Sequence, residues 1–383
     1  MKEEEARNLM RRGLLFFGLF LISLVIVYME PIWSYQISPN DGQELPLQSP
    51  PPTSLNLESI PTQGIAQWIG QPMKAFTTLY GEAQSVTDSG FGFFSHQFRM
   101  DADAFMEVTT IDQRITSIKV LGETSMDIGP FEYQMSLEEL TTYTVISPIV
   151  SVEYGGETYS LELMEDDINY RPLVAFDNGS YAILFFDHQD KRSGLYSLMY
   201  LDTETLLKLA PYVLTEGQPQ FFVAEKAADW ITIDDQKSET SRYLMQQLRR
   251  SYDFPAYSTS LALQRETQAL LTDFLVNQED YLSTERLRSF QRIQQQELNQ
   301  NWVLTNQEVR TLVEELDEEK TFAHFEMPVY DPIFTLLSWY SNPYLVSRLF
   351  YDESEAIGVA FSKENMLVLF QEINQPTESS EQP

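Results

Sequence analysis

Residues 13–29 read GLLFFGLFLISLVIVYM and divide the chain into two unequal parts. This stretch holds no charged residue and a single weakly polar one, Ser23. As an α-helix it would be about 25 Å long, at roughly 1.5 Å per residue, which is the short end of what spans the hydrocarbon core of a bilayer. The sequence therefore predicts a transmembrane helix at 13–29, followed by about 350 residues that are polar and acidic in character.

The charges beside this helix predict its orientation. The N-terminal tail, residues 1–12, carries four basic residues: Lys2, Arg7, Arg11 and Arg12. The other flank, residues 28–35, has aromatic side chains and no basic one. Because basic residues stay on the cytoplasmic side of a span, we expect a single-pass protein of the cell membrane with a cytoplasmic N-terminus and an extracellular bulk.

Two other interpretations of residues 13–29 are less favoured. A cleaved signal peptide has a shorter apolar region and ends in a small-x-small site, whereas Tyr28 is followed by the bulky Pro31 and Trp33. A buried core helix would show an amphipathic pattern, which this stretch lacks. We therefore favour an uncleaved anchor.

Charge and composition restrict the function of the rest. The chain has 383 residues and a net charge of −32; the tail holds four of its 25 basic and three of its 57 acidic residues, which leaves 21 and 54, or −33, after the span. Such a surface repels nucleic acids and anionic lipid headgroups. There is no cysteine, whereas exported eukaryotic domains usually carry disulfides, so the sequence fits an exported protein of a Gram-positive bacterium.

The expected domain organisation follows from composition along the chain. Residues 30–64 are rich in proline and form an extended linker. The first folded region, 65–214, alternates helix and strand signals twice: a helix at 71–81 and strands to 121, then a capping box at Ser136 and strands to 201. This predicts an α+β domain of two helix-plus-antiparallel-strand repeats. The acidic run at 165–167 is interpreted as a solvated turn between strands, and residues 374–383 as a disordered tail.

The second folded region, 227–373, is expected to hold several helices and a terminal hairpin. The predicted helices cover 242–250, 260–277, 285–299, 308–319 and 333–340. Asp331-Pro332 marks the start of the last one, with aspartate as cap and proline as first residue. The hairpin pairs 356–361 with 366–371.

Several motifs resemble a known pair of domains. "WIGQPMKAFTTLYGEAQ", "VEYGGETYSLELMEDDINYRPLV" and "YLDTETLLKLAPYVL" in the first region resemble the CAP-associated N-terminal domain. That domain precedes a CAP (SCP/PR-1-like) domain in exported bacterial proteins. The second region carries "LRRSYDFPAY", "WYSNPYLVSRLF" and "AIGVAF", which are similar to CAP motifs. The resemblance implies a CAP-like α-β-α sandwich there.

The histidines of the CAP cleft are missing from the matched positions. Leu270, Thr284 and Leu345 stand where typical members have histidine, and Glu326-Met327 replaces a Glu-Asn motif. The resemblance therefore implies a degenerate CAP domain without the family's polar cleft. We expect either core filling or an apolar binding groove there, with four candidate residues: Tyr344, Leu345, Trp339 and Glu326.

Chemistry-bearing residues are scarce. The only histidines, His96, His188 and His324, are too few for a His-rich zinc site within one domain. No H-E-x-x-H, G-x-S-x-G, Walker A or G-x-G-x-x-G motif is present. We expect no catalytic residue, no metal site and no cofactor. The leading hypothesis is a non-enzymatic binding or scaffolding protein at the cell envelope with a membrane or cell-wall protein as partner. The alternative is a wall- or lipid-active enzyme with an unrecognised site.

Overall fold

The computed structural model describes residues 58–100, 104–187, 194–314, 316, 320–342 and 344–373, and the fold reported below is that of these residues. The predicted anchor at 13–29, the tail at 1–12, the linker up to residue 57 and the tail at 374–383 lie outside them. Within the described residues, no helix is both long enough and apolar enough to cross a membrane.

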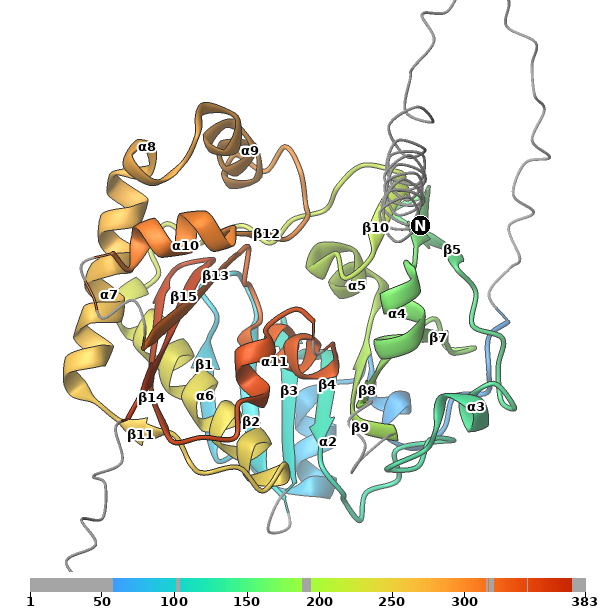
Figure 1. The fold of residues 1–383 in the computed structure, drawn as a ribbon. Coiled ribbons are helices and arrows are strands. Elements are labelled where there is room, and N and C mark those ends of the chain that lie inside the picture. Colours follow the sequence, from blue (N-terminus) through green and yellow to red (C-terminus); the bar gives the residue numbers. More distant parts are fainter. Residues whose placement is uncertain are drawn as a thin grey trace, which may run out of the picture. The chain divides into compact units, whose positions relative to one another are not determined.

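A seven-stranded antiparallel sheet organises the first region, in the order β1-β2-β3-β4-β9-β8-β7 (Figure 1). Its strands are β1 (Ser85–Asp88), β2 (Phe94–Arg99), β3 (Phe105–Ile111), β4 (Arg114–Leu121), β7 (Leu173–Ala175), β8 (Tyr181–Asp187) and β9 (Gly194–Leu201). The α+β prediction is confirmed. However, strands from both predicted repeats join through the β4–β9 pair, so the two repeats share one sheet.

A second, three-stranded sheet and five short helices complete this region. The sheet runs β10-β6-β5, with β5 (Ile149–Tyr154), β6 (Glu157–Glu162) and β10 (Val213–Glu216). The helices are η1 (Gly64–Trp68), α2 (Met73–Tyr80), α3 (Leu137–Leu140), α4 (Glu165–Tyr170) and α5 (Thr203–Leu209). Ser136 caps α3 in the predicted capping box.

Two expectations for this region were wrong. The linker was expected to reach residue 64, but Ile60 is buried and forms a backbone bridge with Phe176 beside the sheet edge. Burial of this apolar side chain stabilises the packing of residue 60 against the first region. The acidic run at 165–167 is not a solvated turn but the first turn of α4. Negative charge suits a helix N-terminus, and Asp167 is buried in an ion pair with Arg171 at 2.6 Å.

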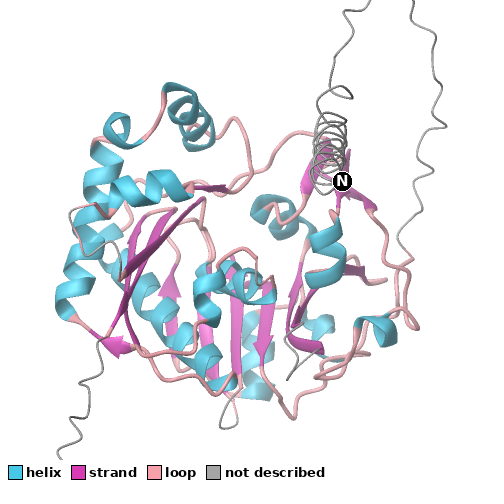
Figure 2. Cartoon of the chain, in the orientation of Figure 1, coloured by secondary structure: helices cyan, strands magenta, loops and turns pink. Residues whose placement is uncertain are grey.

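The second region is an α-β-α sandwich, as the resemblance implied. Its sheet runs β11-β14-β15-β13-β12, with β11 (Ser258–Thr259), β12 (Trp302–Val303), β13 (Thr321–Met327), β14 (Glu355–Ser362) and β15 (Asn365–Glu372). The flanking helices are α6 (Trp230–Ser251), α7 (Leu261–Val276), α8 (Gln278–Tyr281), α9 (Thr284–Gln294), α10 (Asn306–Leu312), α11 (Pro332–Ser341) and η2 (Ser347–Phe350). Figure 2 shows helices on both sides of this sheet.

The alternation along β14 explains the two layers of helices. Ile357 and Val359 belong to the core formed with α6 and α11, whereas Ala356 and Ala360 face the core formed with α7 and α9. Helix bounds differ from the predictions mainly at the ends. α6 begins at Trp230, twelve residues before the predicted start, and α10 ends at Leu312 instead of continuing into the acidic run that follows. Acidic residues at a helix C-terminus oppose the helix dipole.

The two regions share one hydrophobic core. Residues 333–341 of α11 are all buried, because α11 packs on α6 on one side and on β8 of the first region on the other. The rings of Phe185 and Phe334 lie 6.2 Å apart, and the Tyr196 hydroxyl donates to the Leu337 carbonyl at 2.6 Å. The regions predicted as separate domains therefore form one packed unit.

Candidate functional site

Glu326 and Trp339, two of the four predicted groove residues, contact each other in the interior. Glu326 lies at the end of β13, and Trp339 lies on α11. The indole Nε1 donates to the Glu326 Oε2 atom at 2.7 Å, and both side chains are buried. Trp339 therefore fills the core, which is one of the two outcomes expected from the sequence.

His324 and Asn301 complete the environment of the Glu326 carboxylate. The Asn301 Nδ2 atom donates to Glu326 Oε1 at 3.0 Å, and His324 Nε2 lies 3.3 Å from Oε2. The His324 ring also packs edge-on against Trp339, with centroids 4.7 Å apart. The pocket beside Glu326 has a volume of about 10 Å³, room for at most one water. A histidine–carboxylate pair can exchange protons, but the pocket on the Glu326 side is too small for a substrate.

Tyr344 and Leu345, the other two groove residues, lie on the surface. Their side chains are 80% and 49% exposed. They follow the end of α11, where the Asn342 amide donates to Asp166 of α4 at 3.1 Å. The predicted groove of Tyr344, Leu345, Trp339 and Glu326 is therefore not one open cleft, because two of its members are exposed and two are buried.

The positions matched to the family's histidines also lie apart. Leu270 packs against the core on the α7 side of the five-stranded sheet. Leu345 follows α11, which packs on the opposite side. Thr284 is exposed at the start of α9. These three residues therefore do not outline a common cleft.

His96, a second histidine of the described residues, has ordinary surroundings. His96 on β2 contacts the Thr110 hydroxyl at 3.0 Å, and burial lowers its pKa. His188 lies outside the described residues. Among the residues that the structure does describe, no group of three or more acidic or histidine side chains could hold a metal ion.

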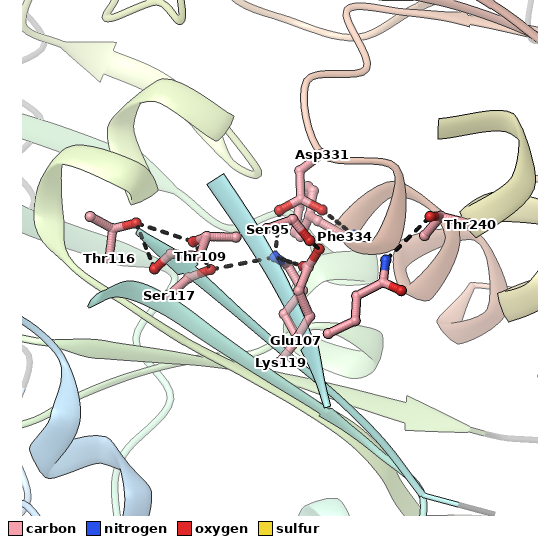
Figure 3. A network of polar contacts seen from close by, with 10 residues as sticks. Ser95, Glu107, Thr109, Thr116, Ser117, Lys119, Thr240, Asp331 and Phe334 are labelled. Atoms are coloured by element: carbon pink, nitrogen blue, oxygen red, sulfur yellow. Dashed lines mark hydrogen bonds and ion pairs between the residues drawn. The ribbon is translucent and has the colours of Figure 1, made fainter. Parts of the chain in front are cut away.

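A buried charged network joins the two regions, and the sequence analysis missed it (Figure 3). Lys119 on β4 contacts Glu107 on β3 and Asp331 at the start of α11, each at 2.5 Å. The three side chains are 1%, 5% and 6% exposed. Ser95 donates to Glu107, and Asp331 also accepts from the Phe334 amide at 3.0 Å as the cap of α11. The network therefore ties the central helix of the second region to the sheet of the first.

Electrostatics favour the charged form of Lys119. Burial lowers the pKa of Lys119, but Asp331 and Glu107 more than offset this and raise it above its usual value. Burial raises the pKa of Glu107, against the opposing effect of Lys119. The signal that could have indicated the network is a single charged residue in each of two otherwise uncharged strands, Glu107 in 104–109 and Lys119 in 115–121.

Lys237 of α6 lies beside this network. Its Nζ atom donates to the Lys363 carbonyl at 3.1 Å and lies 4.4 Å from the centre of the Phe91 ring. Burial lowers the pKa of Lys237 to about 8. The pocket between Lys237 and Glu107 has a volume of only about 30 Å³, so the cluster joins elements and offers no room for a metabolite.

Comparisons with known proteins find a family model that resembles most of the first region. Residues 69–212 match the family model described as CAP-associated N-terminal. Over 153 residues the chain is 26% identical to the uncharacterized membrane protein YlbC of Bacillus subtilis (strain 168), an alignment that covers 40% of this chain and 43% of YlbC. The match thus spans less than half of that relative.

Two solved structures share the fold. One is a cysteine-rich secretory protein from Staphylococcus aureus subsp. aureus Mu50, with a TM-score of 0.63 and 17% identity over 83% of this chain and 95% of that one. The other is an extracellular protein containing a SCP domain from Bacillus anthracis str. Ames, with a TM-score of 0.62 and 16% identity over 88% and 100%. At these identities the likeness concerns the fold alone.

Proposed function

Because residues 69–212 form a CAP-associated N-terminal domain ahead of a CAP-like sandwich, we propose that this protein is a membrane-anchored extracellular binding or scaffolding protein without catalysis of its own. The name of the Bacillus subtilis relative, a membrane protein, supports a place at the membrane. One of the structural neighbours is described as extracellular, which supports an exported bulk.

The enclosure of Glu326 carries the proposal. Both of its carboxylate oxygens accept hydrogen bonds, from Asn301 on one side and Trp339 on the other. A general acid or base must reach the proton that it transfers, directly or through one water. With about 10 Å³ beside it, Glu326 can serve as a buried hydrogen-bond acceptor that fixes α11 against β13.

The topology in this proposal uses the N-terminal sequence. The apolar stretch 13–29 is the single span, the basic tail stays in the cytoplasm, and the linker holds the folded unit away from the bilayer. The net charge of −32 argues against nucleic acid as a partner. The partner in this proposal is a protein of the membrane or the cell wall of a Gram-positive bacterium.

Crosslinking in intact cells tests the proposal. Two forms are compared: the full chain, and a form in which residues 13–29 are replaced by a cleavable signal peptide. A membrane protein captured by the anchored form alone identifies the chain as an accessory subunit. Glu326→Gln keeps the shape of the side chain, so the variant should capture the same partner as the unmodified chain.

Two results would overturn this function. If neither form captures a protein, the chain does not act by binding a protein at the envelope. If purified full chain hydrolyses cell-wall or lipid material and Glu326→Gln abolishes that turnover while the variant keeps its fold, the enzyme alternative replaces the proposal.

A further inference from the structure

The outer face of α7 carries little charge for so acidic a chain. The inner face packs into the core through Leu263, Thr267, Leu271 and Phe274. The outer face is mixed: Leu261 and Val276 are 77% and 74% exposed, and Ala262 and Ala269 are exposed between them, beside the polar Arg265, Gln268, Thr272 and Asp273. α7 lies on the outer side of the sandwich (Figure 1).

The two exposed charges on this face are arranged symmetrically about Ala269, and the half-buried Glu266 lies at the edge of the face. Arg265 lies four residues before Ala269, and Asp273 lies four residues after it; both are exposed. Ala262 and Val276 lie seven residues before and after the same alanine. At 100° per residue these five positions share one stripe, opposite the buried one.

We propose that this stripe is the docking surface for a second copy of the chain, with the two α7 helices antiparallel and crossing at Ala269. In that arrangement Arg265 of each copy faces Asp273 of the other, and Ala262 faces Val276. A two-fold interface must be complementary to itself, and this stripe is. The proposal goes beyond the function proposed above, because it holds whether or not the protein has another partner.

Charge explains why a second copy would dock here. Each copy carries a net charge of −32, so most of its surface repels another copy. The α7 stripe holds one cation and one anion, which cancel, and antiparallel pairing turns them into two ion pairs. Hydrogen bonds from Tyr281 and Asn277 lower the pKa of Asp273, so its carboxylate is charged at neutral pH. The small Ala269 side chain lets the helix axes approach to about 8–10 Å.

The arrangement fixes distances that can be tested. Position 269 meets its own copy at the two-fold axis, close enough for a disulfide. Position 261 lies eight residues from the axis, so its two copies are about 24 Å apart along the helices. A parallel pair would bring equal positions together along the whole helix.

The chain contains no cysteine, so single-cysteine variants report these distances without background. The full chain is expressed in bacterial membranes as Ala269→Cys or Leu261→Cys, treated with a mild oxidant and separated on a non-reducing gel. Both positions are exposed on the same helix, which makes them a matched pair. We expect at least tenfold more disulfide-linked dimer for Ala269→Cys than for Leu261→Cys.

Charge reversal gives a second measurement in the Ala269→Cys background. Arg265→Glu places two acidic residues opposite each other and should lower the dimer yield at least fivefold, whereas Arg265→Glu with Asp273→Arg should restore it. Equal yields at positions 269 and 261 would mean random collisions, and a higher yield at 261 would mean a different pairing; either overturns the proposal. If Asp273→Arg disturbs the fold by removing the contact with Tyr281, the dimer yields at positions 269 and 261 still test the antiparallel pairing, because neither of those variants changes Asp273.

Discussion

Replacing Lys119 with methionine should destabilise both regions together. The substitution keeps the length of the side chain, so it leaves no large cavity, but it removes the cation between Glu107 and Asp331. Two carboxylates then remain buried with no opposite charge at 2.5 Å. Removing one partner of a buried ion pair costs about 3–5 kcal/mol.

A similar loss of stability follows from the free energy of protonating one of the two carboxylates. One of the two carboxylates can escape the repulsion by binding a proton, and from an ordinary pKa near 4.5 this costs about 3.4 kcal/mol at pH 7, at 1.36 kcal/mol per unit. At pH 5 the same protonation costs about 0.7 kcal/mol. In the variant, the pKa of the protonated carboxylate is higher in the folded state than in the unfolded state. The resulting loss of stability is therefore small at low pH and grows as the pH rises above the carboxylate's ordinary pKa. We therefore expect the loss in unfolding free energy to shrink from about 3–5 kcal/mol at pH 7 to about 1–2 kcal/mol at pH 5.

Urea unfolding of the full chain in detergent micelles measures this loss. Tryptophan fluorescence reports on both regions, because Trp68 lies in the first and Trp302 in the second. The control is Arg292→Met, which removes a surface ion pair with Glu297 at 3.2 Å whose side chains are both more than half exposed; it should cost under about 0.5 kcal/mol. A loss below about 1 kcal/mol for Lys119→Met, or a loss that does not depend on pH, would refute the reasoning.

Three further predictions concern single contacts. Gly358→Ala should cost about 1–3 kcal/mol, because the new Cβ would overlap the Thr267 hydroxyl and push α7 off β14; urea unfolding measures the loss, and a neutral result would contradict the packing. Tyr196→Phe should cost about 1 kcal/mol by the same assay, since it removes the hydrogen bond to the Leu337 carbonyl at 2.6 Å. Lys237 releases its proton near pH 8 when folded and near 10.5 when unfolded, so its contribution to stability rises with pH in that window. Relative to Lys237→Met, the unmodified chain should therefore gain about 1–2 kcal/mol between pH 8 and pH 9.5, and parallel stability curves would contradict this.

Local signals predicted some of the helix starts of this fold. Asp331 accepts from the Phe334 amide ahead of Pro332, as the Asp-Pro pair indicates. Ser136 forms the predicted capping box with Glu139 at the start of α3. These predictions succeed because a cap is decided by residues within one turn. The three acidic residues that open α4 are the same kind of signal, and counting them as first-turn residues would have found that helix.

The buried network could not be predicted in the same way, because it depends on a register shift. Ile111 pairs with Arg114 across the β3–β4 turn, and continuing that register would place Glu107 opposite Ile118. A one-residue irregularity between Thr109 and Thr110 moves the pairing, so Glu107 faces Lys119. A shift of one residue exchanges the faces of a strand, and sequence alone does not show where it occurs.

The contact of Lys119 with Asp331 lies further beyond prediction, since some 210 residues separate the two. The position of α11 between the two regions also explains why this helix is buried on every side. A helix on the surface of a sandwich would need one polar face, but α11 has the sheet of one region on one side and α6 of the other region opposite it. Its sequence, PIFTLLSWYS, is therefore the sequence of an interface. Because α11 also carries Trp339, which holds Glu326, the packing that joins the two regions and the packing that encloses this carboxylate depend on the same helix. Opening the space around Glu326 would therefore require α11 to lose its packing against both α6 and β8.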